Sequence, residues 1–341
     1  MQTKSNTKNN TLNIILGSVL ISAALTAVIG FTAASLTRFE IVGHTIAFAY
    51  PWRLVEHSDM ARITAWLGYI LHNLSVWGLI WYAKREKPKY TNNLQWFNWA
   101  LIAVNIVFAL LHVVQTQIWY DGLAQDVPEI TALGSVAVML MIIIILETPR
   151  RGLIFGKKFK FHTAFIDIVK KYHGYLFAWA IIYDYWYHPT ANTFGHLMGF
   201  YYNFLIIAQS ALIFNRTHLN KYWTFFLEAF VLIHGVAVAV FQGQTFWQMF
   251  AFGFGAMIIL TQMYGLGLST WAKRGLSIGF LVVTVGIYAY MDRLGALNEV
   301  IRIPMIDYLF IFVIYGLFLL INWIVNLFKR KPETVTISGT D

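Results

Sequence analysis

The chain of 341 residues contains no cysteine. Disulfides, thiolate metal ligands, iron–sulfur clusters and covalent haem attachment through CxxCH are therefore excluded. Any metal would be held by histidine, carboxylate, tyrosine, methionine or backbone ligands. Charge is also scarce, because only 12% of the residues are charged, whereas 58% are hydrophobic and 17% are aromatic. This composition is typical of a membrane protein rather than of a soluble domain.

Several common motifs are missing as well. The sequence has no GxxxxGK[ST], no GxSxG and no strand-associated GxGxxG, so chemistry based on a nucleotide or a nucleophilic serine lacks its usual residues. No lysine lies in the middle of an apolar run, which argues against a retinal Schiff base. There is no HExxH, so a metal site would have to combine residues from separate helices.

Ten apolar runs of about 20 residues are long enough to cross the hydrocarbon core of a bilayer. They lie near residues 12–35, 63–83, 96–119, 129–147, 168–187, 194–214, 222–241, 245–264, 275–291 and 303–328. We therefore predict an all-α, polytopic transmembrane helix bundle of about ten spans. A single membrane domain, residues 12–328, is flanked by polar tails at 1–11 and 329–341. The first run is longer than a signal-peptide core, so we interpret it as an uncleaved anchor.

The net charge of +9 does not indicate nucleic-acid binding, because the basic residues do not form one patch. They alternate between loops instead. With a cytoplasmic N-terminus, 20 of the 25 basic residues fall inside. The five outside are Arg38, Arg53, Arg62, Arg293 and Arg302. This distribution follows the positive-inside rule. It predicts a prokaryotic-type protein of the inner (cytoplasmic) membrane, with both termini in the cytoplasm.

Two loops stand out. The external loop at 37–62 contains IVGHTIAFAYPWRL, which is aromatic and apolar, so we expect it to fold over the helix ends or lie in the interface. The cytoplasmic loop at 148–161 contains TPRRGLIFGKKFKF. Its basic and aromatic residues favour contact with anionic lipid over a partner-binding role.

Four histidines, His72, His112, His196 and His234, each lie in a different apolar run, and all fall in the predicted external half. An ionisable side chain inside a membrane is costly, so it usually has a function. Histidine in particular indicates a metal, a haem or a proton path. Helical spacing places polar residues on the same faces as these histidines, as with Gln115 three residues after His112.

Three further titratable residues are candidates for catalysis or proton transfer. Asp184 and His188 form an i, i+4 pair at the outer end of the fifth run, just before a proline. The next run begins a few residues later with His196, so these groups should cluster at the external mouth. Glu228 lies in the inner half of the seventh run, six residues before His234 and on a different face of the helix.

The favoured hypothesis is a membrane protein that binds haem b or another histidine-ligated metal and transfers electrons or protons, as a membrane oxidoreductase would. Small residues one helical turn from the histidines, such as Gly68 and Gly199, could make room for a macrocycle, although close helix packing also explains them. A quinol or an external redox protein would be a fitting partner beside the lipid bilayer. The alternatives are a proton-coupled transporter that uses Glu228, Asp184 and the histidines, and a structural membrane subunit.

Overall fold

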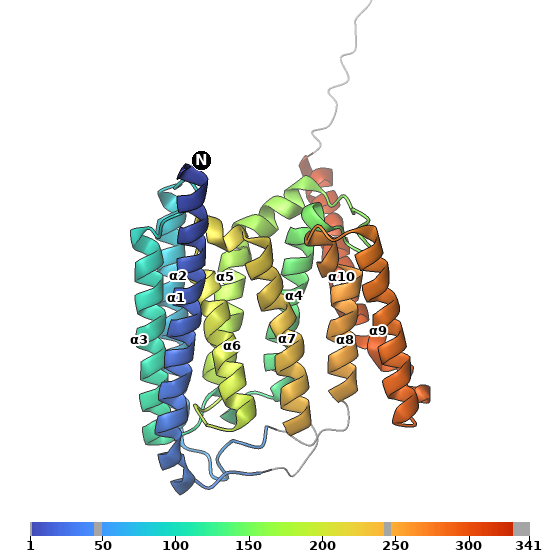
Figure 1. The fold of residues 1–341 in the computed structure, drawn as a ribbon. Helices are drawn as coiled ribbons and strands as arrows, with labels where there is room; N and C mark the ends of the chain where they lie inside the picture. Colours follow the sequence, from blue (N-terminus) through green and yellow to red (C-terminus); the bar gives the residue numbers. More distant parts are fainter. Residues whose placement is uncertain (1, 44–49, 242–246, 330–341) are drawn as a thin grey trace, which may run out of the picture.

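The computed structural model describes residues 2–43, 50–241 and 247–329. This part of the chain is all-α, with ten α-helices joined by loops and short 3-10 turns (Figure 1). The helices are α1 (Gln2–Thr32), α2 (Asp59–Arg85), α3 (Trp96–Trp119), α4 (Glu129–Arg151), α5 (Thr163–Tyr187), α6 (Phe194–Ala211), α7 (Lys221–Phe241), α8 (Trp247–Leu260), α9 (Thr270–Tyr290) and α10 (Arg302–Lys329). The 3-10 turns are η1 (Ala33–Arg38), η2 (Leu123–Gln125), η3 (Arg216–Leu219), η4 (Gln262–Gly265) and η5 (Leu294–Ile301).

Seven segments of the described chain are helical, long and apolar enough to cross a membrane. They contain α1, α2, α3, α4, α7, α9 and α10, and they indicate a multi-pass membrane protein. The other three predicted spans form α5, α6 and α8, which are not both long and apolar enough to be included. The described part of α8 has 14 residues, or about 21 Å at the usual helical rise. Both α5 and α6 are interrupted by polar side chains such as Asp184 and Asn203, which lower their hydropathy.

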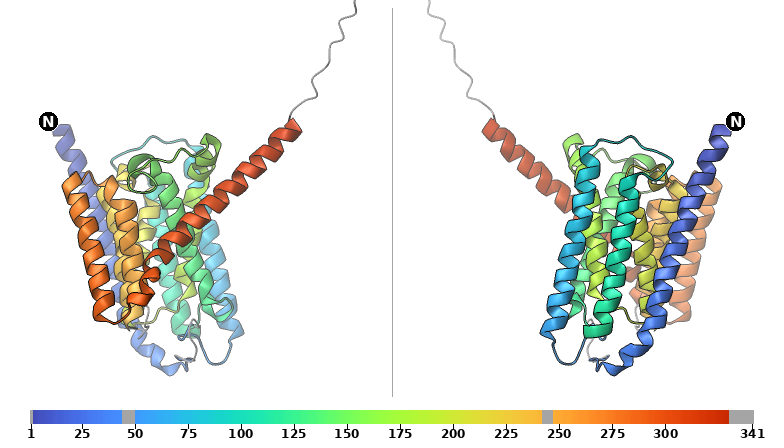
Figure 2. Two further views of the ribbon diagram at one scale, coloured as in Figure 1. Left: turned by 90° about the vertical axis from the view of Figure 1, so that its right-hand side faces the viewer. Right: turned by 90° about the vertical axis from the view of Figure 1, so that its left-hand side faces the viewer.

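Six helices form a closed ring in which each packs against the next, in the order α4, α5, α6, α7, α8 and α10, with α10 returning to α4. On one side, α2 packs on α5 and α1 packs on α6, while α3 lies against both α1 and α2. On the other side, α9 packs on α8 (Figure 1). Figure 2 shows that α10 is tilted relative to the other helices and that its C-terminal half leaves the bundle. The ring is therefore the centre of the fold.

The two ends of the bundle differ in charge. The end at which α1 begins and α10 finishes, called the basic end here, carries clustered basic residues (Figure 1). Among the described residues these include Lys84 to Lys89, Arg150 to Lys160, Arg216, Lys221, Lys273 and Arg274. The opposite end, called the Tyr50 end here, carries the loop between α1 and α2. The alternation predicted from charge therefore agrees with the direction of each helix.

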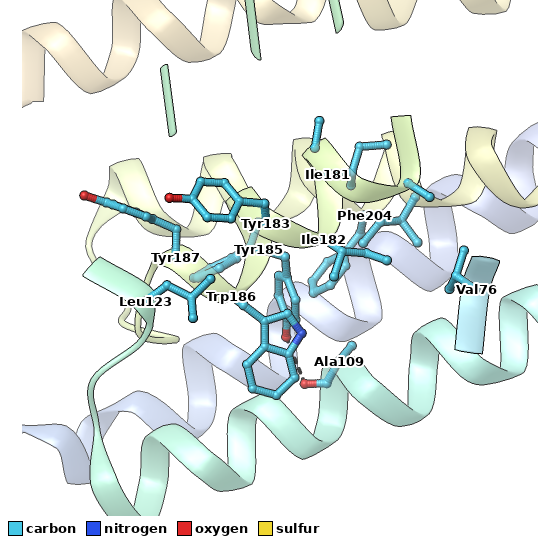
Figure 3. Packing of buried hydrophobic residues seen from close by; sticks show 14 of the residues in the cluster. Val76, Ala109, Leu123, Ile181, Ile182, Tyr183, Tyr185, Trp186, Tyr187 and Phe204 are labelled. Atoms are coloured by element: carbon cyan, nitrogen blue, oxygen red, sulfur yellow. Dashed lines mark hydrogen bonds between the residues drawn. The ribbon is translucent and has the colours of Figure 1, made fainter. Parts of the chain in front are cut away.

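The helix α5 connects two apolar cores. The larger core joins α1 to α6, with Ala132 and Met139 contributed by α4, and the smaller one joins α4, α5, α8 and α10. In the last turn of α5, Tyr185, Trp186 and Tyr187 are each no more than 1% exposed. Figure 3 shows these rings inserted between the neighbouring helices. Aromatic residues on successive positions of a helix point in all directions, so this turn is surrounded by protein on every side.

Candidate functional site

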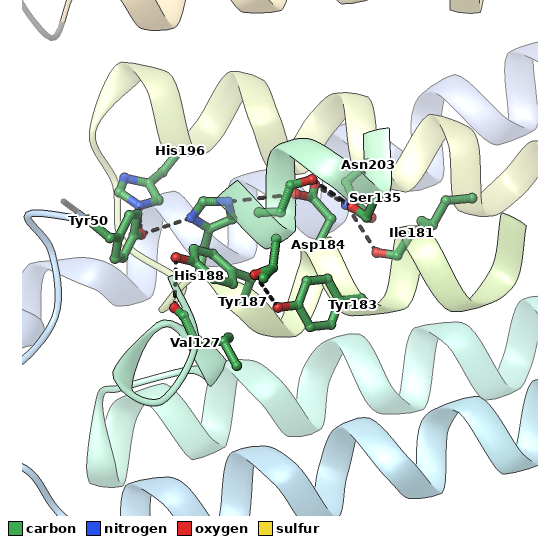
Figure 4. Close-up of polar contacts among 12 residues, drawn as sticks. Tyr50, Val127, Ser135, Ile181, Tyr183, Asp184, Tyr187, His188, His196 and Asn203 are labelled. Carbon is green, nitrogen blue, oxygen red and sulfur yellow. Dashed lines mark hydrogen bonds and ion pairs between the residues drawn. The ribbon is translucent and has the colours of Figure 1, made fainter. Parts of the chain in front are cut away.

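The C-terminal end of α5 and the residue after it contact six separate parts of the protein through six consecutive side chains, which are labelled across Figures 3 and 4. We call residues 183–188 the α5 hub. Its contacts are Tyr183 with Thr131 of α4, Asp184 with Asn203 of α6, Tyr185 with the carbonyl of Ala109 in α3, Trp186 with His72 of α2, Tyr187 with the carbonyl of Val127, and His188 with Tyr50. Two of the predicted site residues, Asp184 and His188, therefore lie at the centre of the fold.

The hydroxyl of Tyr50 joins two of the predicted histidines. It lies 2.7 Å from Nε2 of His196 and 2.9 Å from Nδ1 of His188 (Figure 4). On its other side, Nδ1 of His196 lies 2.7 Å from the hydroxyl of Thr193, which also caps α6. The prediction that His188 and His196 cluster at this end is confirmed, since their ring centroids are 5.7 Å apart.

Asp184 continues this chain of polar groups into the bundle. Its Oδ1 lies 3.9 Å from Nε2 of His188, and its Oδ2 accepts a hydrogen bond of 3.0 Å from the amide of Asn203. The first distance is too long for a direct hydrogen bond. The side chains of Asp184 and His188 are 27% and 30% exposed, so a water molecule can reach both. We call Thr193, His196, Tyr50, His188 and Asp184 the polar relay.

The groups of the relay that lie outside the helices are neutral at neutral pH. Burial, and then the charges of nearby histidines, lower the pKa of His188 well below its ordinary value. Burial raises the pKa of Tyr50, so its hydroxyl keeps its proton. A single hydroxyl between two imidazoles can donate to only one of them at a time. The hydrogen bonds of the relay can therefore all point one way along it or all point the other way. The two arrangements differ in which of the two bonded atoms carries the proton in each hydrogen bond.

His72 and His112 are both fully buried, and Trp186 lies between them. The indole N–H of Trp186 donates to Nδ1 of His72 over 3.2 Å, so Nε2 of His72 donates to the amide oxygen of Asn105 over 2.9 Å. His112 lies 3.0 Å from the amide oxygen of Gln115 and 2.8 Å from the carbonyl of His188. Both partners of His112 are acceptors, so the neutral ring donates to one of these oxygens and its other nitrogen only faces the second one.

His234 is the predicted ligand with the most open surroundings. In the described part of the chain, neither of its ring nitrogens has a hydrogen-bond partner. Its ring centroid lies 5.9 Å from that of Tyr202 in α6. It packs against α6 at Gly199, where an added Cβ would lie 2.9 Å from Nε2 of the imidazole. His234 is thus a neighbour of the relay rather than a member of its hydrogen-bonded chain.

Glu228 does not meet the histidines but forms a buried ion pair. Its Oε2 lies 2.6 Å from Nη1 of Arg151, and the two side chains are only 4% and 3% exposed. These residues belong to α7 and α4, which lie on opposite sides of the six-helix ring. The pair therefore joins the ring across its width near the basic end. Arg151 was treated in the sequence only as part of a basic loop, and nothing in the local pattern signals its burial.

The space beside the histidines is occupied by protein side chains. A Cβ at Gly68 would lie 2.2 Å from the indole of Trp186, so this glycine admits the indole. Gly199 admits the imidazole of His234 in the same way. Among the described residues, no group of three or more histidine and carboxylate side chains is placed to share a metal ion. Haem or metal binding by His72, His112, His196 and His234 stays a prediction, and three of these would first have to give up hydrogen bonds.

The sequence interpretation missed Tyr50, Thr193 and Trp186 as partners of the histidines. Tyr50 lies in the aromatic loop that was expected to fold over the helix ends, and its 6% exposure confirms that this part of the loop packs inward. Residues 44–49 of the same loop lie outside the described chain. Thr193 could have been recognised as the N-cap of the helix that begins at Phe194. Trp186 gave no signal, because nothing in the sequence distinguishes it from its aromatic neighbours.

Comparison with protein-family models, with curated proteins and with solved structures finds no match. The class of protein is therefore assigned from its own sequence and structure. It is an all-α, multi-pass membrane protein whose titratable groups form a connected chain at one end of the bundle and a buried ion pair near the other.

Proposed function

We propose that this protein transfers protons through the six-helix ring, as a proton-coupled transporter of the cytoplasmic membrane. In this proposal all ten helices cross the bilayer and both termini are cytoplasmic, so the Tyr50 end faces outward. The observation that carries the proposal is the polar relay. Histidine and tyrosine are joined at hydrogen-bond distances of 2.7 and 2.9 Å, and the remaining gap of 3.9 Å to Asp184 needs one bridging water.

The relay can pass a proton inward in defined steps. A proton reaching Nδ1 of His196 from the Thr193 side allows Nε2 to release its proton to the Tyr50 oxygen. Tyr50 in turn donates its own proton to Nδ1 of His188. Nε2 of His188 then releases a proton to Asp184 through a bridging water. His196, Tyr50 and His188 each gain one proton and release one, so they end with the same number as at the start, while Asp184 gains one proton.

The ion pair near the basic end supports a second element of the mechanism. Because Arg151 and Glu228 join opposite sides of the ring, their contact closes it beyond Asp184. The hydroxyl of Tyr202 in α6 donates to the carbonyl of Leu227, the residue before Glu228, over 2.9 Å, so α6 is attached to α7 beside the ion pair. We propose that release of a proton from Asp184 toward the cytoplasm accompanies separation of this pair. Such coupling of a titrating carboxylate to a closed contact is what alternating access needs.

The test is proton uptake into proteoliposomes that contain a pH-sensitive dye and carry an imposed membrane potential. Wild-type protein should acidify the lumen. Asp184→Asn and Tyr50→Phe should slow uptake about a hundredfold, since each removes one proton-transfer group while keeping the size of the side chain. The matched control is Asp59→Asn, which neutralises an 86% exposed carboxylate at the same end of the bundle. Equal uptake by wild type and both relay variants would refute the proposal.

A further inference from the structure

A separate cavity of about 370 Å³ lies at the basic end, where the chain turns from η4 into α9. It is lined by Tyr264, Thr270, Lys273, Arg274, Ser277 and Ile278. The five residues from α9 are spaced so that they share one face of the helix over its first three turns. The cavity thus combines two cations and three hydroxyl groups. We call it the α9 pocket.

The cations of the α9 pocket are not neutralised by the protein. Within the described residues, neither Lys273 nor Arg274 forms an ion pair, and the sequence has no acidic residue between Glu228 and Asp292. They contact aromatic rings instead. Lys273 lies 5.2 Å from the ring centroid of Tyr264, and Arg274 lies 5.5 Å from that of Trp271. Such contacts hold a cation in place while its charge stays available to an anion.

The wall opposite α9 is fixed by the basic loop at 148–161. The backbone N–H of Phe155 donates to the carbonyl of Leu260 over 2.7 Å, just before η4. Gly156 then allows the ring of Tyr264 to approach its backbone, where a Cβ would lie 2.7 Å from the ring. Because these contacts fix Tyr264, the pocket is built before any ligand arrives. A preformed site loses less entropy on binding than a mobile one.

The surface next to the pocket indicates which anion it takes. Trp271 is 80% exposed at the start of α9, as expected for a ring at the headgroup level of a membrane. Below the pocket, the exposed stripe of α9 becomes apolar, with Ile278 at 61% and Leu281 at 60% exposure. An anion bound by Lys273 and Arg274 would therefore have an apolar surface directly beneath it, facing the bilayer.

We propose that the α9 pocket binds the phosphate of an anionic phospholipid, with the acyl chains along the apolar stripe of α9. Basic pockets at the cytoplasmic ends of membrane helices are suited to this role. The phosphate accepts from Lys273, Arg274 and the hydroxyl of Thr270, whereas the hydroxyl of Ser277 donates to the carbonyl of Lys273. The site is remote from the polar relay, so it does not depend on the proton-transfer proposal.

The test is binding of defined lipids to the purified full-length protein, measured as lipid adducts by native mass spectrometry. Phosphatidylglycerol should bind and phosphatidylcholine should not compete with it. Lys273→Gln with Arg274→Gln should weaken phosphatidylglycerol binding about 30-fold, as expected for the loss of two basic residues near a membrane surface. A third arm adds inorganic phosphate, which should not displace the lipid, because it has no acyl chains to contact α9.

The matched control is Arg85→Gln with Lys89→Gln, two exposed basic residues at the same end of the bundle. Arg85 also lies over an exposed tryptophan, at 5.5 Å from the ring of Trp81, so it reproduces the contact of Arg274. This control should change binding less than twofold. A further variant, Ser277→Trp, keeps both charges but fills the cavity, and it should also abolish the adduct. Equal losses in the pocket and control variants, unchanged binding in Ser277→Trp, or displacement of the lipid by inorganic phosphate would each overturn the proposal.

Discussion

Replacing Arg151 by methionine leaves the carboxylate of Glu228 buried without its partner. Both side chains are at most 4% exposed, so neither charge can recover its hydration by a small rearrangement. Removing one member of a buried ion pair typically lowers the free energy of unfolding by about 3–5 kcal/mol. We expect this cost for Arg151→Met and again for Glu228→Leu. The double variant removes both charges together and should be within about 1 kcal/mol of wild type, or more stable.

The measurement is a double-mutant cycle on unfolding in detergent, followed by tryptophan fluorescence. A control cycle uses Arg150 and Glu147, which form an ion pair in the same last turns of α4 with side chains that are 34% and 26% exposed. Exposed pairs contribute less than about 1 kcal/mol, so this second cycle should show little coupling. If the two single losses at Arg151 and Glu228 simply add in the double variant, the pair does not hold α4 to α7, and the closure assigned to it is wrong.

Three further outcomes are expected. Burial raises the pKa of Asp121 from 3.8 to about 7, so the folded protein holds this proton more tightly than the unfolded chain. The contribution of Asp121 to stability should therefore be greatest below about pH 4 and fall by up to about 4 kcal/mol as the pH rises to about 7. Asp121→Asn should remove this part of the pH dependence of the unfolding midpoint. Gly68→Ala should destabilise the protein by about 1–3 kcal/mol, because its methyl group overlaps Trp186. The control is Gly78→Ala on the same helix, which should not destabilise it, since no atom lies within 4 Å of the added Cβ. Equal unfolding midpoints for the two variants would contradict the packing described. Protein purified from a haem-replete host should show no Soret band and no stoichiometric metal, because His72, His112 and His196 already form hydrogen bonds with protein atoms. Detection of either signal would restore the cofactor hypothesis.

The helices were predictable from sequence because long apolar runs and alternating loop charge are properties of single segments. Within the described residues, each of the ten predicted runs overlaps an α-helix, and the direction of each helix agrees with the basic residues at its end. The length of α8 was not predictable to the same degree. Apolar residues continue past Leu260 into η4, so hydropathy alone does not show where the helix ends.

The site was only partly predictable. The spacing of Asp184, His188 and His196 placed them correctly at one helix end, since a short loop fixes that proximity. Gln115 was recognised as a neighbour of His112 on the same helix face, and it lies 3.0 Å from its ring. The partners of His72 come from 33 or more positions away, and the second partner of His112 is the carbonyl of His188, so none of these carries a sequence signal. Glu228 was recognised as a costly intramembrane charge, but its partner Arg151 was not, because a basic residue at a helix end usually faces solvent or lipid headgroups.

The α5 hub has a consequence for how the protein can move. Six neighbouring positions hold six separate attachments, and one added or deleted residue would turn those beyond it by about 100° around the helix axis. The same geometry makes α5 a poor candidate for independent motion. A shift along its axis would be transmitted at once to α2, α3, α4 and α6 and to the loop that carries Tyr50. The helix that supplies the carboxylate of the relay is therefore also the helix whose displacement would shift its neighbours throughout the bundle.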